Sequence, residues 1–125
     1  MIIDTSAIIA LAFEEHWADW VDQRIAEADR VLMSSVNLVE ALIIFRDRKP
    51  ATEARLRGDL LDSGILFVPP DLAVAILAAD ARSRYPLNFG DCFAYALAKA
   101  ERQSLLTLDA DFRGLDVPVI LPPEH

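Results

Sequence analysis

The sequence is short of the residues that carry much familiar enzyme chemistry. Its 125 residues include one cysteine and two histidines. This excludes an internal disulfide and a zinc site built from cysteine and histidine ligands. Cys92 lies in an apolar run and is expected to be a small core residue. His16 lies in an acidic stretch and His125 is the last residue, so Ser–His–Asp or Cys–His catalysis is poorly supported. If the protein is an enzyme, we therefore expect the carboxylates of Asp and Glu residues to carry out its chemistry.

Positive charge is also scarce. The chain has 12 Lys and Arg residues against 20 Asp and Glu residues, and its formal net charge is −8. This balance argues against a basic nucleic-acid-binding surface spread over the protein. It does not exclude a nuclease, because acids that collect divalent cations can accept a phosphate once the metal is bound. An acidic chain would also suit a basic protein partner.

The chain contains no apolar run of membrane-spanning length, no low-complexity segment and no repeat. With 54% hydrophobic residues, it is expected to form one domain over residues 1–125. Residues 1–4 include no basic leader, so we expect a cytoplasmic protein with no membrane attachment.

Short apolar segments alternate with amphipathic stretches, which predicts a parallel sheet covered by helices on both faces. The expected fold is a three-layer α/β/α sandwich with a central, mainly parallel sheet of four to five strands. Pro118 places the last strand at an edge, and Leu72, Ile76 and Ala79 are expected to face the core. The expected strands cover residues 2–3, 31–33, 65–68, 105–108 and 117–120, and the expected helices cover residues 7–12, 16–28, 37–46, 52–64, 72–84 and 88–98.

Four carboxylates follow strands or open helices in this scheme. Asp4 follows the first strand, Glu40 opens the helix after the second, Asp91 opens a late helix, and Asp109 follows the fourth strand. All four are therefore expected at the carboxyl ends of the strands, where sites in such sheets lie. Their mutual repulsion should raise some of their pKa values and cost stability. A divalent cation would remove that cost, and oxygen ligands select Mg²⁺ or Mn²⁺.

Each acid also has a structural explanation. Asn88 is a good N-cap and places Asp91 at the third helical position, where the helix dipole should keep its carboxylate ionised. Asn37 and Glu40 have the same spacing and form a potential capping box. Asp109 and Asp111 are both common turn residues. Each acid could be a cap or turn residue when considered alone. It is less expected that four acids with only such structural roles would all lie at the same end of one sheet.

Four segments together resemble PIN domains, most closely the VapC-type toxins of bacterial toxin–antitoxin pairs. The resemblance runs from end to end of the chain and implies a PIN-like fold. It implies an endoribonuclease that depends on Mg²⁺ or Mn²⁺ and is usually a homodimer. It also implies inhibition by a cognate antitoxin whose C-terminal segment lies over the active site. The segments are Met1–Ala7, Asn37–Glu40, Leu87–Ala98 and Leu105–Phe112.

By position, the resemblance makes Asp4, Glu40 and Asp91 the core ligands and Asp109 the fourth, with Asp111 as second choice. Thr5 or Ser6 would supply a supporting hydroxyl, although either residue also suits the N-cap of the first helix. Metal-activated water would then attack an RNA phosphodiester in line. The candidates for contact with the RNA backbone are Arg46, Arg48, Lys49, Arg82 and Arg84.

Two other functions remain open at this stage. One is a catalytically silent PIN-like module that keeps the fold and binds a partner, which absence of Mn²⁺ binding would favour. The other is a receiver-type, Mg²⁺-binding phosphoacceptor domain. That domain would need a lysine across the acidic pocket, whereas Lys49 and Lys99 fall at helix ends or interiors.

Overall fold

The computed structural model describes residues 1–123, so His125 lies outside the described residues. The strands are β1 (Ile2–Ile3), β2 (Leu32–Ser34), β3 (Leu66–Val68), β4 (Leu105–Leu106) and β5 (Val119–Ile120). The α-helices are α1 (Thr5–Ala12), α2 (Ala18–Glu27), α3 (Ser35–Arg48), α4 (Glu53–Leu61), α5 (Leu72–Arg84) and α6 (Phe89–Glu101). A short 3₁₀ helix, η1 (Ala110–Phe112), follows β4.

The five strands form one parallel sheet in the order β3-β2-β1-β4-β5. The first strand is therefore central, and Ile2 pairs with both Leu32 and Leu105. β5 lies at an edge, as Pro118 predicts. Because the strands are parallel, their carboxyl ends meet at one edge of the sheet.

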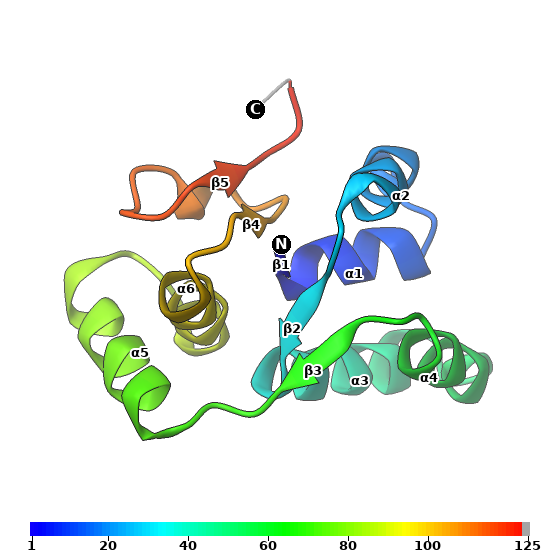
Figure 1. The fold of residues 1–125 in the computed structure, drawn as a ribbon. Coiled ribbons are helices and arrows are strands. Elements are labelled where there is room, and N and C mark those ends of the chain that lie inside the picture. The colour runs from blue at the N-terminus through cyan, green and yellow to red at the C-terminus, as the bar shows by residue number, and fades with distance from the viewer. Residues whose placement is uncertain (124–125) are drawn as a thin grey trace.

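Two apolar cores cover the two faces of the sheet, so the predicted three-layer α/β/α arrangement is confirmed. Side chains along β1 alternate between them: Ile2 packs in the core under α5 and α6, and Ile3 packs in the core formed with α1, α3 and α4. Figure 1 shows α5 and α6 on one side of the strands and α1 to α4 on the other.

Two helices begin earlier than the sequence predicts. α1 begins at Thr5 and is capped by Asp4, whose side chain accepts from the Ser6 N–H, so neither Thr5 nor Ser6 is its cap. α3 begins at Ser35 with Ser34 as its cap, and the predicted cap, Asn37, lies inside the first turn. In both cases the polar residue that ends the strand also starts the helix, which leaves no loop between them.

The face that α5 buries also differs from the prediction. Leu72 is 77% exposed, Ile76 is 54% exposed and Ala79 is also exposed, whereas Val74, Ala78 and Ala81 are buried. α5 packs more extensively on α6 than on any other element. The small side chains of the two buried alanines allow the two helices to approach closely. The larger side chains are left on the outside of the helix.

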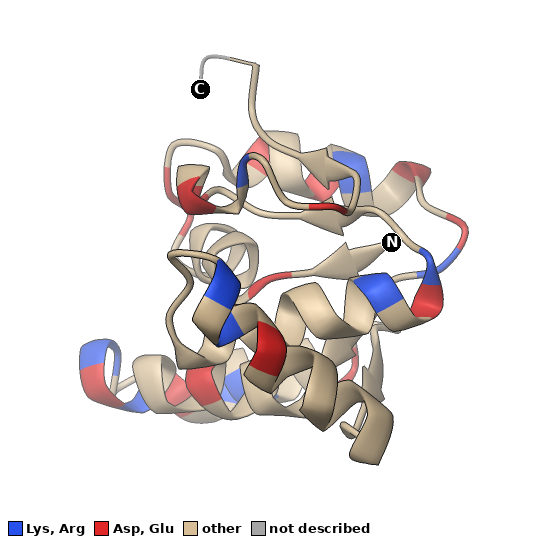
Figure 2. Ribbon diagram, turned by 90° about the vertical axis from the view of Figure 1, so that its left-hand side faces the viewer, with Lys and Arg blue, Asp and Glu red and all other residues tan. Residues whose placement is uncertain are grey.

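Charged residues are distributed over the helices and loops with both signs interspersed, as the view in Figure 2 shows. Within residues 1–123, no helix is both long enough and apolar enough to span a bilayer.

Candidate active site

Asp4 is the most deeply buried of the predicted acids. It directly follows the central strand and is 2% exposed. Its Oδ2 accepts hydrogen bonds from Ser6 Oγ at 2.7 Å and from Thr107 Oγ1 at 2.9 Å. Burial raises the pKa of Asp4, and the hydrogen bonds from Ser6 and Thr107 act in the opposite direction. A carboxyl group in this position is held rigidly by hydroxyl donors from two separate strand ends.

Thr107 is a site residue that the sequence reasoning missed. It is fully buried beyond the end of β4, and its Oγ1 accepts from the Asp109 N–H at 3.0 Å while donating to Asp4. Ser6 makes the parallel link, because its Oγ accepts from the Leu108 N–H at 3.0 Å. The available signal was a hydroxyl residue two positions before Asp109 in an otherwise apolar strand.

Glu40 lies one turn into α3 and faces α6. Its Oε1 accepts from Thr5 Oγ1 and from Asn37 Nδ2, both at 2.8 Å. Its carboxylate lies against Gly90, where an added Cβ would overlap it. Only glycine leaves room for the carboxylate at this point of α6. Of the two predicted supporting hydroxyls, Thr5 therefore contacts Glu40 and Ser6 contacts Asp4.

Asp91 lies in the first turn of α6, as predicted. Asn88 Oδ1 accepts from the Asp91 N–H at 2.8 Å, and Asp91 Oδ2 accepts from the Asn88 N–H at 3.2 Å, which completes a capping box. The structural and ligand explanations of this acid are therefore compatible, because the cap holds the side chain in place.

The helix dipole does not keep Asp91 fully ionised near neutral pH, although the sequence predicts that it would. Its pKa is raised to about 7, first by burial and then by the charge of Asp4, with further contributions from Asp109 and Glu40. The Asn88 hydrogen bond lowers the pKa but does not compensate. Desolvation and like charges outweigh the helix dipole here. The same shift places Asp4, Asp109 and Glu40 within electrostatic range of Asp91.

The fourth acid is better placed at Asp109 than at Asp111. Asp109 caps η1, and its Oδ1 accepts from the Asp111 N–H at 2.9 Å. Its own N–H is bound to Thr107, which also binds Asp4. The Asp111 side chain is exposed and belongs to the turn.

The four carboxylates are neighbours held by separate hydrogen bonds. Within residues 1–123, no three side chains of Asp, Glu, His or Cys are arranged to hold one metal ion as they stand. The donor chemistry nevertheless fits a hard divalent cation, because burial and the charges of Asp4, Asp109 and Glu40 together raise the pKa of Asp91, and a cation would offset both effects. Binding one ion would require the side chains to shift towards one another.

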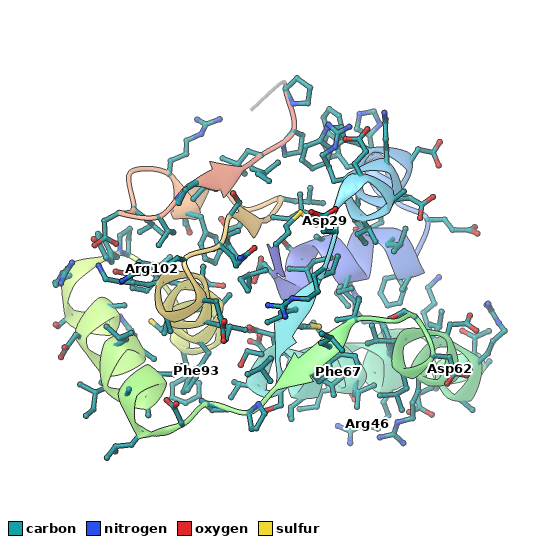
Figure 3. The ribbon with its side chains drawn as sticks, viewed as in Figure 1. Asp29, Arg46, Asp62, Phe67, Phe93 and Arg102 are labelled. Atoms are coloured by element: carbon teal, nitrogen blue, oxygen red, sulfur yellow. The ribbon has the colours of Figure 1, made fainter. Side chains whose placement is uncertain are left out.

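The five basic candidates occupy different surroundings. Arg46 pairs with Asp47 and extends outward from α3 (Figure 3). Arg48 and Lys49 lie over the Phe13 ring, about two helical turns beyond Glu40.

On the other face, Arg84 contacts Asp116 at 3.8 Å and the Tyr85 hydroxyl at 3.1 Å. Arg82 is exposed and close enough to Cys92, the neighbour of Asp91, for its charge to act on the thiol. Arg82 is therefore the candidate whose charge reaches a residue adjacent to Asp91.

A PIN domain family model matches residues 1–118. The chain belongs to the PIN domain family. Ribonuclease VapC30 from Mycobacterium tuberculosis is 34% identical over 134 residues, which span 98% of this PIN domain and all of that protein. Ribonuclease VapC from Mycolicibacterium smegmatis is also 34% identical, over 96% of this chain and 99% of its own length. The resemblance to VapC-type PIN domains is thus confirmed, and a receiver-type domain loses its support.

Solved structures show the same fold. VapC20 from Mycobacterium tuberculosis, a toxin that cleaves the sarcin–ricin loop, superposes with a TM-score of 0.81 at 17% identity, covering 97% of this PIN domain and 98% of that chain. A chain of a toxin–antitoxin complex from Klebsiella pneumoniae gives a TM-score of 0.77 at 24% identity, covering 95% and 94% of the two chains.

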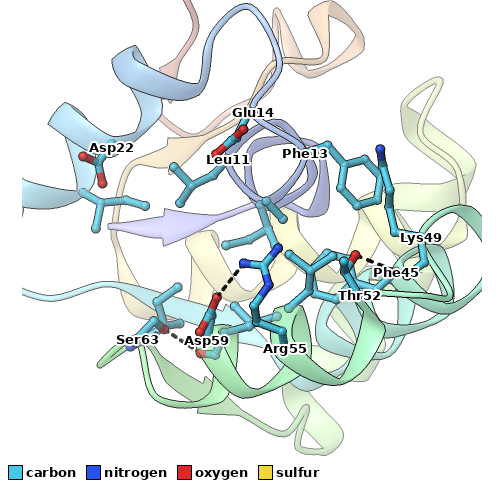
Figure 4. Close-up of a pocket in the computed structure, with 16 residues that line it drawn as sticks. Leu11, Phe13, Glu14, Asp22, Phe45, Lys49, Thr52, Arg55, Asp59 and Ser63 are labelled. Carbon is cyan, nitrogen blue, oxygen red and sulfur yellow. Dashed lines mark hydrogen bonds and ion pairs between the residues drawn. The ribbon is translucent and has the colours of Figure 1, made fainter.

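This PIN domain also has a cavity of about 560 Å³ between α1, α2, α3 and α4, away from the first turns that carry the acids. Its lining is apolar at the base and carries both charges, including Arg55, which pairs with Asp59 at 3.6 Å (Figure 4). The apolar lining includes Ile8, Leu11, Phe45, Leu56, Leu60 and Ile65, and the charged lining includes Glu14, Asp22, Lys49, Arg55 and Asp59.

Proposed function

We propose that this PIN domain is an endoribonuclease and the toxin of a toxin–antitoxin pair. The observation that carries the proposal is the buried Asp4, held by two hydroxyl groups and surrounded by Glu40, Asp91 and Asp109. A buried carboxyl group with carboxylate neighbours costs stability, so its presence favours a chemical role. Membership of a family with named ribonucleases supports the same activity.

The four acids would hold Mg²⁺ or Mn²⁺. A bound ion of this kind would polarise the RNA phosphodiester and make a water molecule more acidic. Ser6 and Thr107 would keep Asp4 in position, and Thr5 would do the same for Glu40. Asp91 would lose its proton on binding, because a cation reverses the electrostatic cause of its raised pKa. Arg82 is the candidate for contact with the RNA backbone.

The test is cleavage of total RNA by the purified chain in Mg²⁺ or Mn²⁺, with the cleaved ends mapped. Asp4→Asn and Asp91→Asn should abolish cleavage while circular dichroism shows a folded protein. Asp62→Asn, an exposed acid at the end of α4, is the matched control and should cleave normally. Full metal-dependent activity in either site variant would contradict the proposal.

A cognate antitoxin is proposed as the protein partner, and a segment of it would cover the active site. We assign its apolar anchoring segment to the cavity between α1 and α4, because the apolar base suits nonpolar side chains and the charged lining suits a flanking polar chain. The net charge of −8 favours a basic flank. Leu11→Ala, at a half-buried residue of the cavity lining, should weaken inhibition by the antitoxin and leave RNA cleavage intact.

A homodimer is proposed from the exposed apolar residues on α3, β3, α5 and the start of α6. In Figure 1, α3, β3 and the start of α5 lie along the lower edge of the molecule. Exposed apolar side chains favour association with another protein surface, and a second copy is the partner proposed here. The residues are Val39, Ile43, Leu66, Leu72, Ile76 and Phe89.

A further inference from the structure

Asn37 is buried at the junction of α3 and α6 and is fully shielded from solvent. Its Nδ2 donates to Glu40 Oε1 at 2.8 Å and to the Gly90 carbonyl oxygen at 3.0 Å. One side chain therefore joins the first turn of α3 to the first turn of α6. Glu40 follows in the next turn of α3, and Asp91 lies in the first turn of α6.

The other end of the Asn37 amide has no partner. Its Oδ1 is buried and accepts no hydrogen bond within residues 1–123. A buried carbonyl without a donor lowers stability. Turning the amide over would not relieve this, because Oδ1 would then face two acceptors, Glu40 Oε1 and the Gly90 carbonyl. The Asn37 side chain therefore keeps its hydrogen bond to Glu40, while its own Oδ1 stays buried without a donor.

The Glu40 carboxylate is held asymmetrically. Thr5 Oγ1 and Asn37 Nδ2 both donate to Oε1, and within residues 1–123 Oε2 accepts no hydrogen bond. Both carboxylate oxygens lie close to Gly90, the residue that precedes Asp91, and Oε2 is the nearer of the two to the position of an added Cβ. The two donors therefore leave Oε2 without a hydrogen bond, next to the first turn of α6.

We propose that Asn37 is a positioning residue, which holds Glu40 through Oε1 and leaves Oε2 without a hydrogen-bond donor, as the oxygen with which Glu40 would bind a divalent cation. The proposal rests on the proposed function, because it assigns a divalent cation to these acids. It extends that function by naming a residue with no acidic group, and by stating which Glu40 oxygen remains free. Asn37 acts through Glu40 and contacts neither the ion nor the RNA.

The variants are Asn37→Leu and Asn37→Asp. Leucine has a similar size, removes both Nδ2 hydrogen bonds and also removes the unpartnered carbonyl. Aspartate keeps the shape but places a carboxylate oxygen against Glu40. Ser34→Ala is the matched control, because Ser34 caps the same helix through the Val36 N–H and makes no contact with Glu40. It weakens the start of α3 without touching the carboxylates.

The first measurement is Mn²⁺ affinity by calorimetric titration in the absence of RNA. Asn37→Leu should weaken binding by about 10- to 100-fold, the usual effect of losing a residue that orients a ligand. Its thermal midpoint should stay equal to that of the unaltered chain or rise. The second measurement, on an RNA oligonucleotide that contains a mapped cleavage site, should show a lower kcat with KM changed by less than about threefold.

Unchanged Mn²⁺ affinity in Asn37→Leu would overturn the positioning role even if the chain cleaves RNA. Equal losses of affinity in Asn37→Leu and Ser34→Ala would also overturn it, since both would then reflect a weakened helix. Failure of the unaltered chain to cleave RNA would count against the proposed function alone, because the titration needs no RNA. Failure of the unaltered chain to bind Mn²⁺ would overturn both.

Discussion

The Asp91 carboxyl group has two opposite effects on the stability of the fold. Its side chain completes the capping box of α6, which stabilises the helix. The same position places it beside Asp4, Asp109 and Glu40 and raises its pKa to about 7. Near neutral pH the group is therefore poised between its two protonation states, and small changes in local charge will shift its proton.

This shift has a consequence for stability that can be measured without metal. The folded pKa of Asp91, about 7, exceeds the ordinary value of 3.8, so between these values the folded state binds more protons than the unfolded state. Stability should therefore fall as pH rises from about 4 to about 7. Asp91→Asn should remove this loss and be more stable than the unaltered chain at pH 8, by roughly 2 kcal/mol after allowance for solvent screening.

The measurement is urea unfolding at pH 5 and pH 8 in the presence of a chelator. Asp62→Asn provides the control for removal of an exposed carboxylate. If the difference between Asp91→Asn and the unaltered chain were the same at both pH values, the raised pKa of Asp91 would be refuted.

Thr107 offers a second test at a single residue. Thr107→Val keeps the shape of the side chain but removes the donor to Asp4 and the acceptor for the Asp109 N–H. Stability should fall by about 1–3 kcal/mol, because a buried N–H loses its partner. RNA cleavage should fall by about 10- to 100-fold. Thr107→Ser keeps the hydroxyl and should retain most of the cleavage, so equal loss in both variants would argue against a role for the hydroxyl group.

At the scale of elements, the site is built by helices that start where strands stop. α1 is capped by Asp4 and α3 by Ser34, each at the carboxyl end of a strand. α6 has no strand before it, but its first turn is linked to α3 through the Glu40 carboxylate, Asn37 and Gly90. The relative position of α3 and α6 therefore sets the distance between two of the candidate ligands.

Gly90→Ala tests this junction. An added Cβ would overlap the Glu40 carboxylate, so the side chain must move out of its present position. RNA cleavage should fall at least tenfold even though alanine is the better helix former. Gly58→Ala in α4 is the control, because nothing lies within 4 Å of the new Cβ there, and it should raise stability by up to about 1 kcal/mol. Both variants are compared by initial cleavage rates and by urea unfolding. Normal cleavage by Gly90→Ala would show that the position of Glu40 is not critical.

The sequence predicts most of this arrangement, for identifiable reasons. Asn88 is correctly placed as a cap because it precedes a well-defined apolar helix. The caps of α1 and α3 are misplaced because strand and helix follow each other without a loop, and local pattern cannot locate such a boundary. Asp4 and its neighbours are found because the strand ends of a parallel sheet converge whatever the details of packing.

Thr107 and Asn37 could not be found in this way. Each acts through a hydrogen bond to a partner distant in sequence, Thr107 to Asp4 and Asn37 to Gly90. Periodicity describes which side of an element is apolar, but it does not say which buried polar groups meet. The raised pKa of Asp91 could not be predicted from the sequence for the same reason, since it depends on burial and on the distances between four side chains.

At the scale of the whole molecule, the outward apolar residues of α5 govern the proposed homodimer. Ile76→Glu should shift sedimentation from dimer towards monomer at micromolar concentration, because a charge would be buried in the interface. Leu61→Glu on α4 is the matched control, since Leu61 is similarly exposed but is not among the residues of the proposed interface. Sedimentation velocity over a range of concentrations distinguishes the two. A monomeric unaltered chain would contradict the dimer.

The central position of β1 also determines when the site can exist. Ile2 pairs with Leu105, and Asp4 is held by Thr107, so segments from opposite ends of the chain must meet before the carboxylates are arranged. Contacts between such distant segments form late and slowly during folding. During synthesis, a growing chain would therefore have no working nuclease until β4 had emerged from the ribosome. A cell that makes this protein would gain an interval in which an inhibitor can be present before the nuclease is assembled.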